Sequence, residues 1–94
     1  MIICKVLGNV WATKKDEKLN GHKLLVVRSS GGGEAETFVA ADIIGAGIGD
    51  DVLVSKGSVA RNSLKEKDTP IDAVVVGIID SLEVDENILR FQHG

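Results

Sequence analysis

The stretch of sequence with the strongest chemical pattern is residues 45–61, GAGIGDDVLVSKGSVAR, which holds four of the chain's eleven glycines. Closely spaced glycines let backbone amides approach a phosphate, as in dinucleotide-binding loops. That pattern needs a third glycine where this sequence has Asp50, and it leads into a helix, whereas here the strand-like DVLVS follows. Asp50 and Asp51 would also repel an anion. We therefore interpret the glycines as a tight turn between strands.

The other reactive side chains lack the partners that catalysis or metal binding requires. Cys4, His22 and His93 stand apart in the sequence and show none of the paired spacings of a zinc site. No serine occupies a Gly-x-Ser-x-Gly elbow, and no cysteine and histidine pair up to suggest a nucleophile. Carboxylates next to strand ends, such as Asp42, are expected to serve turns or caps. The sequence predicts no metal, no cofactor and no enzymatic activity.

The charge balance argues against nucleic acid and membranes as partners. Eleven Lys and Arg against fourteen Asp and Glu give a net charge of −3, and no stretch gathers the positive charges into a block. Proteins that follow nucleic-acid phosphates or anionic membranes usually carry such a block. The longest apolar run, residues 73–79, is far shorter than the roughly 20 residues that span a bilayer. We expect neither partner.

The first residues and the single cysteine favour a cytoplasmic protein. MIICKVLGNVW has no basic region ahead of an apolar core and meets Lys5 at once, so it is not built like a signal peptide. Cys4 has no second cysteine with which to form a disulfide and lies in an apolar run, where a thiol behaves as a small hydrophobe. This cysteine usage is typical of a reducing compartment.

Short β-branched segments separated by glycine and polar turns predict a mainly β fold. We expect five strands, over residues 2–13, 23–28, 35–42, 51–56 and 72–80. The first strand should bend at Gly8. Ser58 is the expected N-cap of a short helix over residues 59–65. Together these elements predict a small five-stranded OB-like β-barrel with one short helix, with residues 1–94 as a single domain.

The chain carries more apolar residues than its size readily explains. They make up 44% of the composition, and residues 73–79 are apolar on both faces of their strand. A small domain has difficulty covering that much apolar surface with its own atoms. Two explanations stay open. The run crosses the barrel interior and packs under the helix, or copies of the chain cover it by association.

Three segments, taken in order, carry a resemblance to a known family. They are TKKDEKLNGHKLLVV, AADIIGAGIGDDVLVSKGSVAR and PIDAVVVGIID, over residues 13–27, 40–61 and 70–80. Together they resemble the EutN/CcmL family of bacterial microcompartment vertex proteins, from Met1 to about Val84. The resemblance implies a barrel related to the oligonucleotide-binding fold, assembled into a ring of five. It also implies a non-enzymatic, structural role within a cytoplasmic shell.

What the resemblance implies about the shell follows from simple geometry. Hexameric shell proteins tile the flat facets, because a sheet of hexagons is flat. A pentagon in place of a hexagon forces curvature, so pentamers cap the vertices and close the polyhedral shell around its encapsulated enzymes. The sequence does not tell which pathway is enclosed, which shell proteins are contacted, or whether a central pore passes metabolites.

Carried onto this sequence, the resemblance implies subunit contacts or a five-fold axis at Gly45, Ala46, Gly47, Gly57, Ser58 and Arg61. Small residues let neighbouring backbones approach closely, and the donors of Arg61 can bond carbonyls or a carboxylate across the subunit boundary. A solvated charge on a helix stays open as the alternative role of Arg61. Many family members have a second serine where Val59 stands and an apolar or aromatic residue where Asp51 stands, so no side-chain role is assigned there.

The alternative function is an OB-like module that binds single-stranded nucleic acid or a small ligand on the same barrel. Such modules stack bases on aromatic side chains along a basic groove. This chain has only Trp11, Phe38 and Phe91 and a net negative charge, which argue against that function. The sequence also leaves open whether the tail, from about residue 85, is flexible or pairs with a neighbouring chain.

Overall fold

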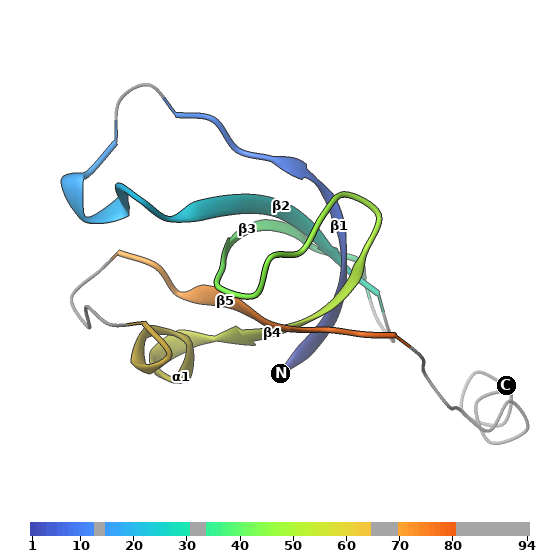
Figure 1. Ribbon diagram of the computed structural model, residues 1–94. Coiled ribbons are helices and arrows are strands. Elements are labelled where there is room, and N and C mark those ends of the chain that lie inside the picture. The colour runs from blue at the N-terminus through green and yellow to red at the C-terminus, as the bar shows by residue number, and fades with distance from the viewer. Residues whose placement is uncertain (13–14, 31–33, 65–69, 81–94) are drawn as a thin grey trace, which may run out of the picture.

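The strands of the chain curl into a closed barrel (Figure 1). The structure is a computed structural model, and the residues it describes are 1–12, 15–30, 34–64 and 70–80. The elements are, in order, β1 (Ile2–Asn9), the 3-10 turn η1 (Glu17–Leu19), β2 (Lys23–Ser29), β3 (Thr37–Asp42), β4 (Asp51–Lys56), α1 (Gly57–Asn62) and β5 (Ala73–Ile78). The predicted mainly β fold is confirmed.

Hydrogen bonds close the sheet in the order β1-β2-β3-β5-β4, with β4 returning to β1. β1 runs antiparallel to both β2 and β4, whereas β3 and β5 run parallel. The register of β1 against β2 shifts between Val6 and Gly8, an irregularity of the kind that bends a strand. The bend predicted at Gly8 and the five-stranded OB-like barrel are confirmed.

The predicted elements differ from the observed ones mainly at their ends. β1 stops at Asn9 instead of residue 13, although the amide of Val10 still donates to the Leu24 carbonyl oxygen at 2.9 Å. The sequence pattern did not predict η1, which begins where Asp16 accepts the amide of Lys18 at 2.9 Å. Such side-chain caps on isolated turns depend on local geometry that alternation of apolar residues does not report.

Small and medium apolar side chains fill the barrel interior. The inner cluster consists of Cys4, Val6, Leu25, Val27, Ala40, Ala46, Val52, Val54, Ala73 and Val75. Alternation along each strand supplies these side chains, since successive residues point to opposite faces. Cys4 is fully buried and burial raises the pKa of its thiol, so it is a protonated hydrophobe, as expected from the sequence.

A second apolar cluster lies outside the barrel, beneath α1. It consists of Ala41, Ala60, Leu64, Ile71 and Val74. Val74 belongs to this outer cluster while Ala73 and Val75 belong to the inner one, so β5 is covered on both faces. Of the two explanations for the apolar run, packing in the barrel and under the helix accounts for these three residues. Ile78, further along the run, remains 39% exposed.

Candidate functional site

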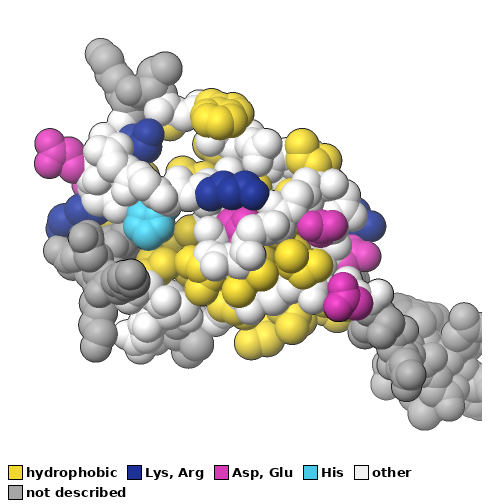
Figure 2. Space-filling view, in the orientation of Figure 1, with side chains coloured by type: hydrophobic (Ala, Val, Ile, Leu, Met, Phe, Trp, Pro, Cys, Tyr) yellow, Lys and Arg dark blue, Asp and Glu magenta, His cyan; other side chains and the backbone are white. Residues whose placement is uncertain are grey.

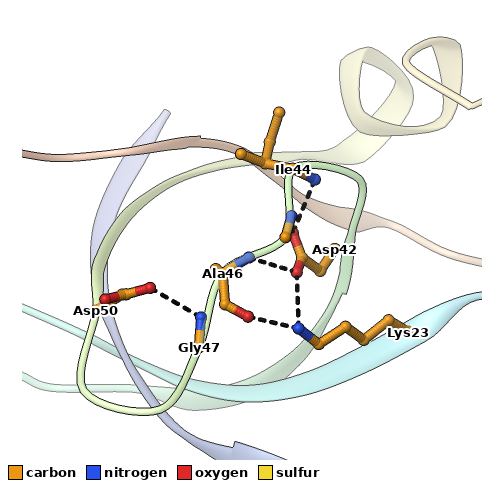
Figure 3. Close-up of polar contacts among 7 residues, drawn as sticks. Lys23, Asp42, Ile44, Ala46, Gly47 and Asp50 are labelled. Atoms are coloured by element: carbon orange, nitrogen blue, oxygen red, sulfur yellow. Dashed lines mark hydrogen bonds and ion pairs between the residues drawn. The ribbon is translucent and has the colours of Figure 1, made fainter.

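The loop between β3 and β4, residues 43–50, is folded around the carboxylate that precedes it (Figure 3). Asp42 accepts three successive backbone amides, with Oδ1 taking those of Ile44 at 2.9 Å and Gly45 at 3.1 Å and Oδ2 that of Ala46 at 2.7 Å. These bonds satisfy donors that no strand partner reaches. The turn role expected for Asp42 is therefore confirmed. We call residues 43–50 the isoleucine loop, after Ile43, Ile44 and Ile48.

Lys23, on β2, fastens the same loop to the barrel wall. Its Nζ lies 3.3 Å from Asp42 Oδ2 and donates to the carbonyl oxygen of Ala46 at 2.5 Å (Figure 3). The Asp42 side chain is fully buried, whereas that of Lys23 is about half exposed. Burial alone would raise the pKa of the Asp42 carboxyl, but the three amides and the Lys23 ammonium outweigh it and hold that pKa below its ordinary value. Asp42 is therefore ionised at neutral pH.

The far half of the isoleucine loop is held by Asp50 and by β1. Asp50 Oδ2 accepts the amide of Gly47 at 2.8 Å, and the amide of Gly49 donates to the Val6 carbonyl oxygen at 2.9 Å. Gly45 and Gly49 have φ angles of 100° and 92°, a left-handed region that other residues rarely adopt. The turns of the loop require glycine at these two positions.

The amides of the isoleucine loop are occupied by the chain's own carboxylates. Those of residues 44–46 donate to Asp42 and that of Gly47 donates to Asp50. Runs of backbone amides of this kind bind phosphate in other proteins. Because Asp42 and Asp50 already satisfy these donors, the interpretation of the glycines as a structural turn, and not a phosphate cradle, is confirmed.

The isoleucine loop presents apolar side chains to solvent. Ala46 is fully buried and joins the inner core, whereas Ile43, Ile44 and Ile48 are 48%, 47% and 66% exposed. Figure 2 shows hydrophobic side chains gathered on the face of the molecule that this loop crosses. Apolar side chains held in water on an ordered loop are typical of a contact surface. In the sequence the glycines mark this region, whereas the three isoleucines give no signal beyond their apolar type within a turn.

Gly57, Ser58 and Arg61 lie on a different element. Gly57 has a φ of 70°, and its amide donates to the Asp72 carbonyl oxygen at 2.7 Å. This turn leads the chain from β4 directly into α1, which begins at Gly57. The helix was expected from residue 59 with Ser58 as its N-cap; the observed α1 begins two residues earlier, and the capping role of Ser58 stays a prediction. The side chains of Ser58 and Arg61 lie outside the described part of the structure.

The six candidate contact residues are thus found in two places. Gly45, Ala46 and Gly47 belong to the isoleucine loop, whereas the others belong to α1, which packs against β4 and β5 (Figure 1). Within the first group, Gly45 and Gly47 are exposed and Ala46 is buried. A single chain therefore offers two distinct surfaces that contain candidate contact residues.

The described residues offer no evidence of a metal centre. Within ranges 1–12, 15–30, 34–64 and 70–80, no three His, Cys, Asp or Glu side chains come together in a way that could hold an ion. None of the helices in those ranges is long and apolar enough to cross a membrane.

These observations define a small, closed OB-like barrel that presents a preformed apolar loop. Residues 1–80 match the sequence family described as ethanolamine utilisation protein EutN/carboxysome. The chain belongs to this EutN/CcmL family, as the resemblance of its three segments indicated.

Relatives of known role cover nearly the whole chain. The carboxysome shell vertex protein CcmL of Synechocystis sp. is 46% identical over 87 residues, which are 89% of this chain and 87% of the relative. The bacterial microcompartment shell vertex protein GrpN of Rhodospirillum rubrum is 45% identical over 86 residues, which are 88% of this chain and 97% of the relative.

Solved structures share the barrel. A carboxysome subunit, CcmL, matches with a TM-score of 0.83 at 44% identity, over 92% of this chain and 93% of that chain. The pentameric microcompartment shell protein GrpN from Rhodospirillum rubrum matches with a TM-score of 0.77 at 43% identity, over 90% of this chain and all of that chain. These relatives are shell proteins and not enzymes, so the expectations of family, fold and a structural, non-enzymatic protein are confirmed.

Proposed function

We propose that this chain forms a pentamer that caps the vertices of a bacterial microcompartment shell, with hexameric shell proteins as its neighbours. The observation that supports this most strongly is the match to GrpN, a pentameric shell protein whose whole solved chain is covered at 43% identity. The relatives named as shell vertex proteins support the same role. The shell would lie in the cytoplasm, as the cysteine usage favours.

A ring of five needs two different contact surfaces on each subunit, because its contacts run head to tail. The isoleucine loop, with Gly45 and Gly47, is one candidate surface. The turn from β4 into α1, with Gly57, Ser58 and Arg61, is the other. Both surfaces lie on one chain without occupying the same place (Figure 1), as such a contact requires.

The isoleucine loop has the properties of a stable contact. Burying the exposed half of one isoleucine side chain contributes about 1 kcal/mol, so Ile43, Ile44 and Ile48 together contribute about 3 kcal/mol at each contact. The loop is already held in shape by Asp42 and Asp50, so little ordering entropy opposes association. A closed ring repeats this gain at five contacts.

Native mass spectrometry tests the pentamer directly. We expect a species of five times 9.9 kDa, about 50 kDa, to persist on dilution. A monomer over the whole concentration range would contradict the proposal. Binding of single-stranded oligonucleotide that weakens as salt is added would favour the alternative OB-like binding module instead.

Co-expression with a hexameric shell protein tests the place in the shell. We expect closed polyhedral particles by electron microscopy when both proteins are present, with this chain retained in the particles. Sheets or open tubes should form when the chain is omitted, because a lattice of hexagons alone cannot close into a polyhedron. Closed particles that form equally well without the chain would contradict the vertex role.

A further inference from the structure

The outer wall of β2 and β3 carries an apolar groove of about 180 Å³ that neither contact surface above includes. Residues of η1, of the two strands and of the segment before β5 form its apolar walls, namely Leu19, Leu24, Val39, Ala41, Pro70 and Ile71. Asp72 is the one charged side chain among the described residues that line it. Ligand pockets usually measure about 300–1,000 Å³, so this groove has the size for an apolar side chain and not for a small ligand.

The groove continues the apolar cluster beneath α1. Ala41 and Ile71 belong to both, and Leu19 and Leu24 pack against the cluster as partly buried side chains. The same cluster holds Ala60 of α1, the helix that carries the second of the two proposed contact surfaces. The groove and α1 therefore lie on one side of the subunit, where the proposed ring places a neighbouring copy.

The isoleucine loop is too small to form a stable contact by lying on a flat surface. The exposed apolar area of its three isoleucines is on the order of 200 Å². A stable contact buries about 800 Å² on each partner. A side chain that enters a groove is surrounded by its walls, and such buried anchors dominate the affinity of protein contacts. The loop therefore needs a concave apolar surface opposite it.

Ile48 and the groove lie at different places around the barrel. The amide of Gly49, the next residue, bonds to Val6 of β1, whereas Val39 of the groove is on β3. In the closed order β1-β2-β3-β5-β4, β2 separates these two strands on one side and β4 and β5 separate them on the other. In Figure 1 the loop crosses the front of the barrel, whereas the chain that enters β5 lies at its left. A projection and a hollow that face different directions fit a head-to-tail contact.

We propose that the groove receives the side chain of Ile48 from a neighbouring copy of this chain. Ile48 is 66% exposed, the most of the three isoleucines, and it stands between Gly47 and Gly49, so no adjacent side chain obstructs its entry. Leu24 and Val39 of the receiving subunit close around it. The inference rests on the proposed ring and names the residues that meet across each of its contacts.

Val39→Lys tests the groove, because it places a charge at the rim while the barrel stays folded. Val39 is 46% exposed, so the circular dichroism spectrum should be unchanged and thermal unfolding should move little. A buried, unpaired ammonium at every contact should raise the concentration at which half of the chains are pentameric by about tenfold or more. Thr37→Lys is the matched control, because Thr37 is exposed on the same face of the same strand and does not line the groove. Native mass spectra of a dilution series measure both variants.

A pair of opposite charges shows whether Ile48 is the occupant. Ile48→Asp alone should dissociate the ring, as Val39→Lys does. With both substitutions in one chain, most of the pentamer should return, because a carboxylate and an ammonium then meet across every contact. Ile48→Asp combined with Thr37→Lys should stay dissociated. If the first combination stays dissociated as well, Ile48 does not fill the groove.

The same spectra separate this inference from the proposed function. A native protein that is monomeric at every concentration overturns the ring and the inference together. Val39→Lys protein that remains fully pentameric overturns the inference alone. If that pentameric variant is lost from particles co-assembled with a hexameric shell protein, the groove contacts the hexamer instead of a copy of this chain.

A disulfide identifies the copy that supplies the isoleucine. Val39→Cys and Ile48→Cys are combined in one chain and oxidised, and Cys4 does not compete because it is fully buried. We expect a ladder of covalent oligomers up to the pentamer on a non-reducing gel. Mixing the two single variants should give crosslinked dimers and nothing larger. A disulfide confined to one chain, or no disulfide in a protein that is pentameric by mass, overturns the proposal.

Discussion

The ammonium of Lys23 lies 3.3 Å from the buried carboxylate of Asp42, and the two residues stand directly opposite each other in the register of β2 and β3. One cross-strand pair therefore fixes the point at which the isoleucine loop leaves the barrel. The same carboxylate then accepts the next three available amides, and Lys23 bonds to the Ala46 carbonyl oxygen. The shape of a surface loop is thus determined by the pairing of two strands, which links barrel stability to the proposed subunit contact.

Asp42→Asn should destabilise the barrel and weaken assembly together. The amide removes the negative charge and one of two acceptor oxygens, which leaves Lys23 without its ion pair and at least one loop amide unsatisfied. We expect a loss of about 2–4 kcal/mol in the free energy of unfolding. Denaturant titration measures this loss, and native mass spectrometry measures the pentamer. Asp51→Asn is the matched control, because its ion pair with Lys5 is half exposed and contributes about 0–1 kcal/mol.

The depressed pKa of Asp42 predicts a specific dependence of stability on pH. Its carboxyl titrates below the ordinary value of 3.8 in the folded chain, so its contribution is fully present above the unfolded pKa and is lost as the pH falls through the folded one. The free energy of unfolding should therefore change little on this account between pH 7 and about pH 5 and should fall below about pH 4. The difference between the native protein and Asp42→Asn should shrink over the same acidic range. A difference that stays constant down to pH 3 would contradict the role given to this carboxylate.

Gly47 should tolerate a small side chain in the fold but no large one in the assembly. It has no left-handed φ, and an added Cβ would meet Asp50 Oδ2 at 3.8 Å, which is an ordinary contact. Gly47→Ala should therefore change the free energy of unfolding by less than about 1 kcal/mol. Gly47→Leu should leave the far-ultraviolet circular dichroism spectrum of the barrel intact and reduce the pentamer in native mass spectra, because its side chain extends from an exposed position on the loop. Unchanged pentamer in Gly47→Leu would remove Gly47 from the contact.

The barrel could be derived from the sequence because its signals are local. β4 was predicted over residues 51–56, as observed, since a short run of strand-forming apolar residues is bounded there by glycines on both sides. The burial of β5 on both faces followed from its unbroken run of valines. Each of these conclusions needs only neighbouring residues.

The arrangement of the isoleucine loop could not be derived in the same way. The bond between Lys23 and Asp42 joins residues 19 positions apart, and it exists only because the register of β2 against β3 sets them opposite each other. Within the loop, Ala46 inserts into the core whereas Ile48, two residues further on, stays 66% exposed. Such choices between neighbouring apolar residues are made by packing and leave no periodic signal.

Arg61→Ala should weaken the pentamer more than it unfolds the barrel. The position lies on α1, at the second of the two proposed contact surfaces, and a guanidinium supplies several donors in a fixed plane that a neighbouring backbone or carboxylate can accept. Arg61→Lys keeps the charge and loses this planar arrangement, so it should recover only part of the assembly. Native mass spectra and thermal unfolding, recorded for both variants, separate the two effects. Full recovery by lysine would show that charge alone matters there.

Ile48→Asp gives the sharpest test of the isoleucine loop as a contact. Ile48 is 66% exposed and lies two residues from the core residue Ala46, so the substitution should change the free energy of unfolding of the subunit by about 0.5 kcal/mol or less. A buried, unpaired carboxylate at a subunit contact costs several kcal/mol, and a five-membered ring incurs that cost at every contact. We therefore expect native mass spectra to shift from pentamer to monomer at concentrations where the native protein is fully assembled. Ala35→Asp, at an exposed position between β2 and β3, is the control and should leave the pentamer intact. If both variants assemble equally well, the isoleucines face solvent in the ring, and the contact has to be sought on the α1 side of the barrel.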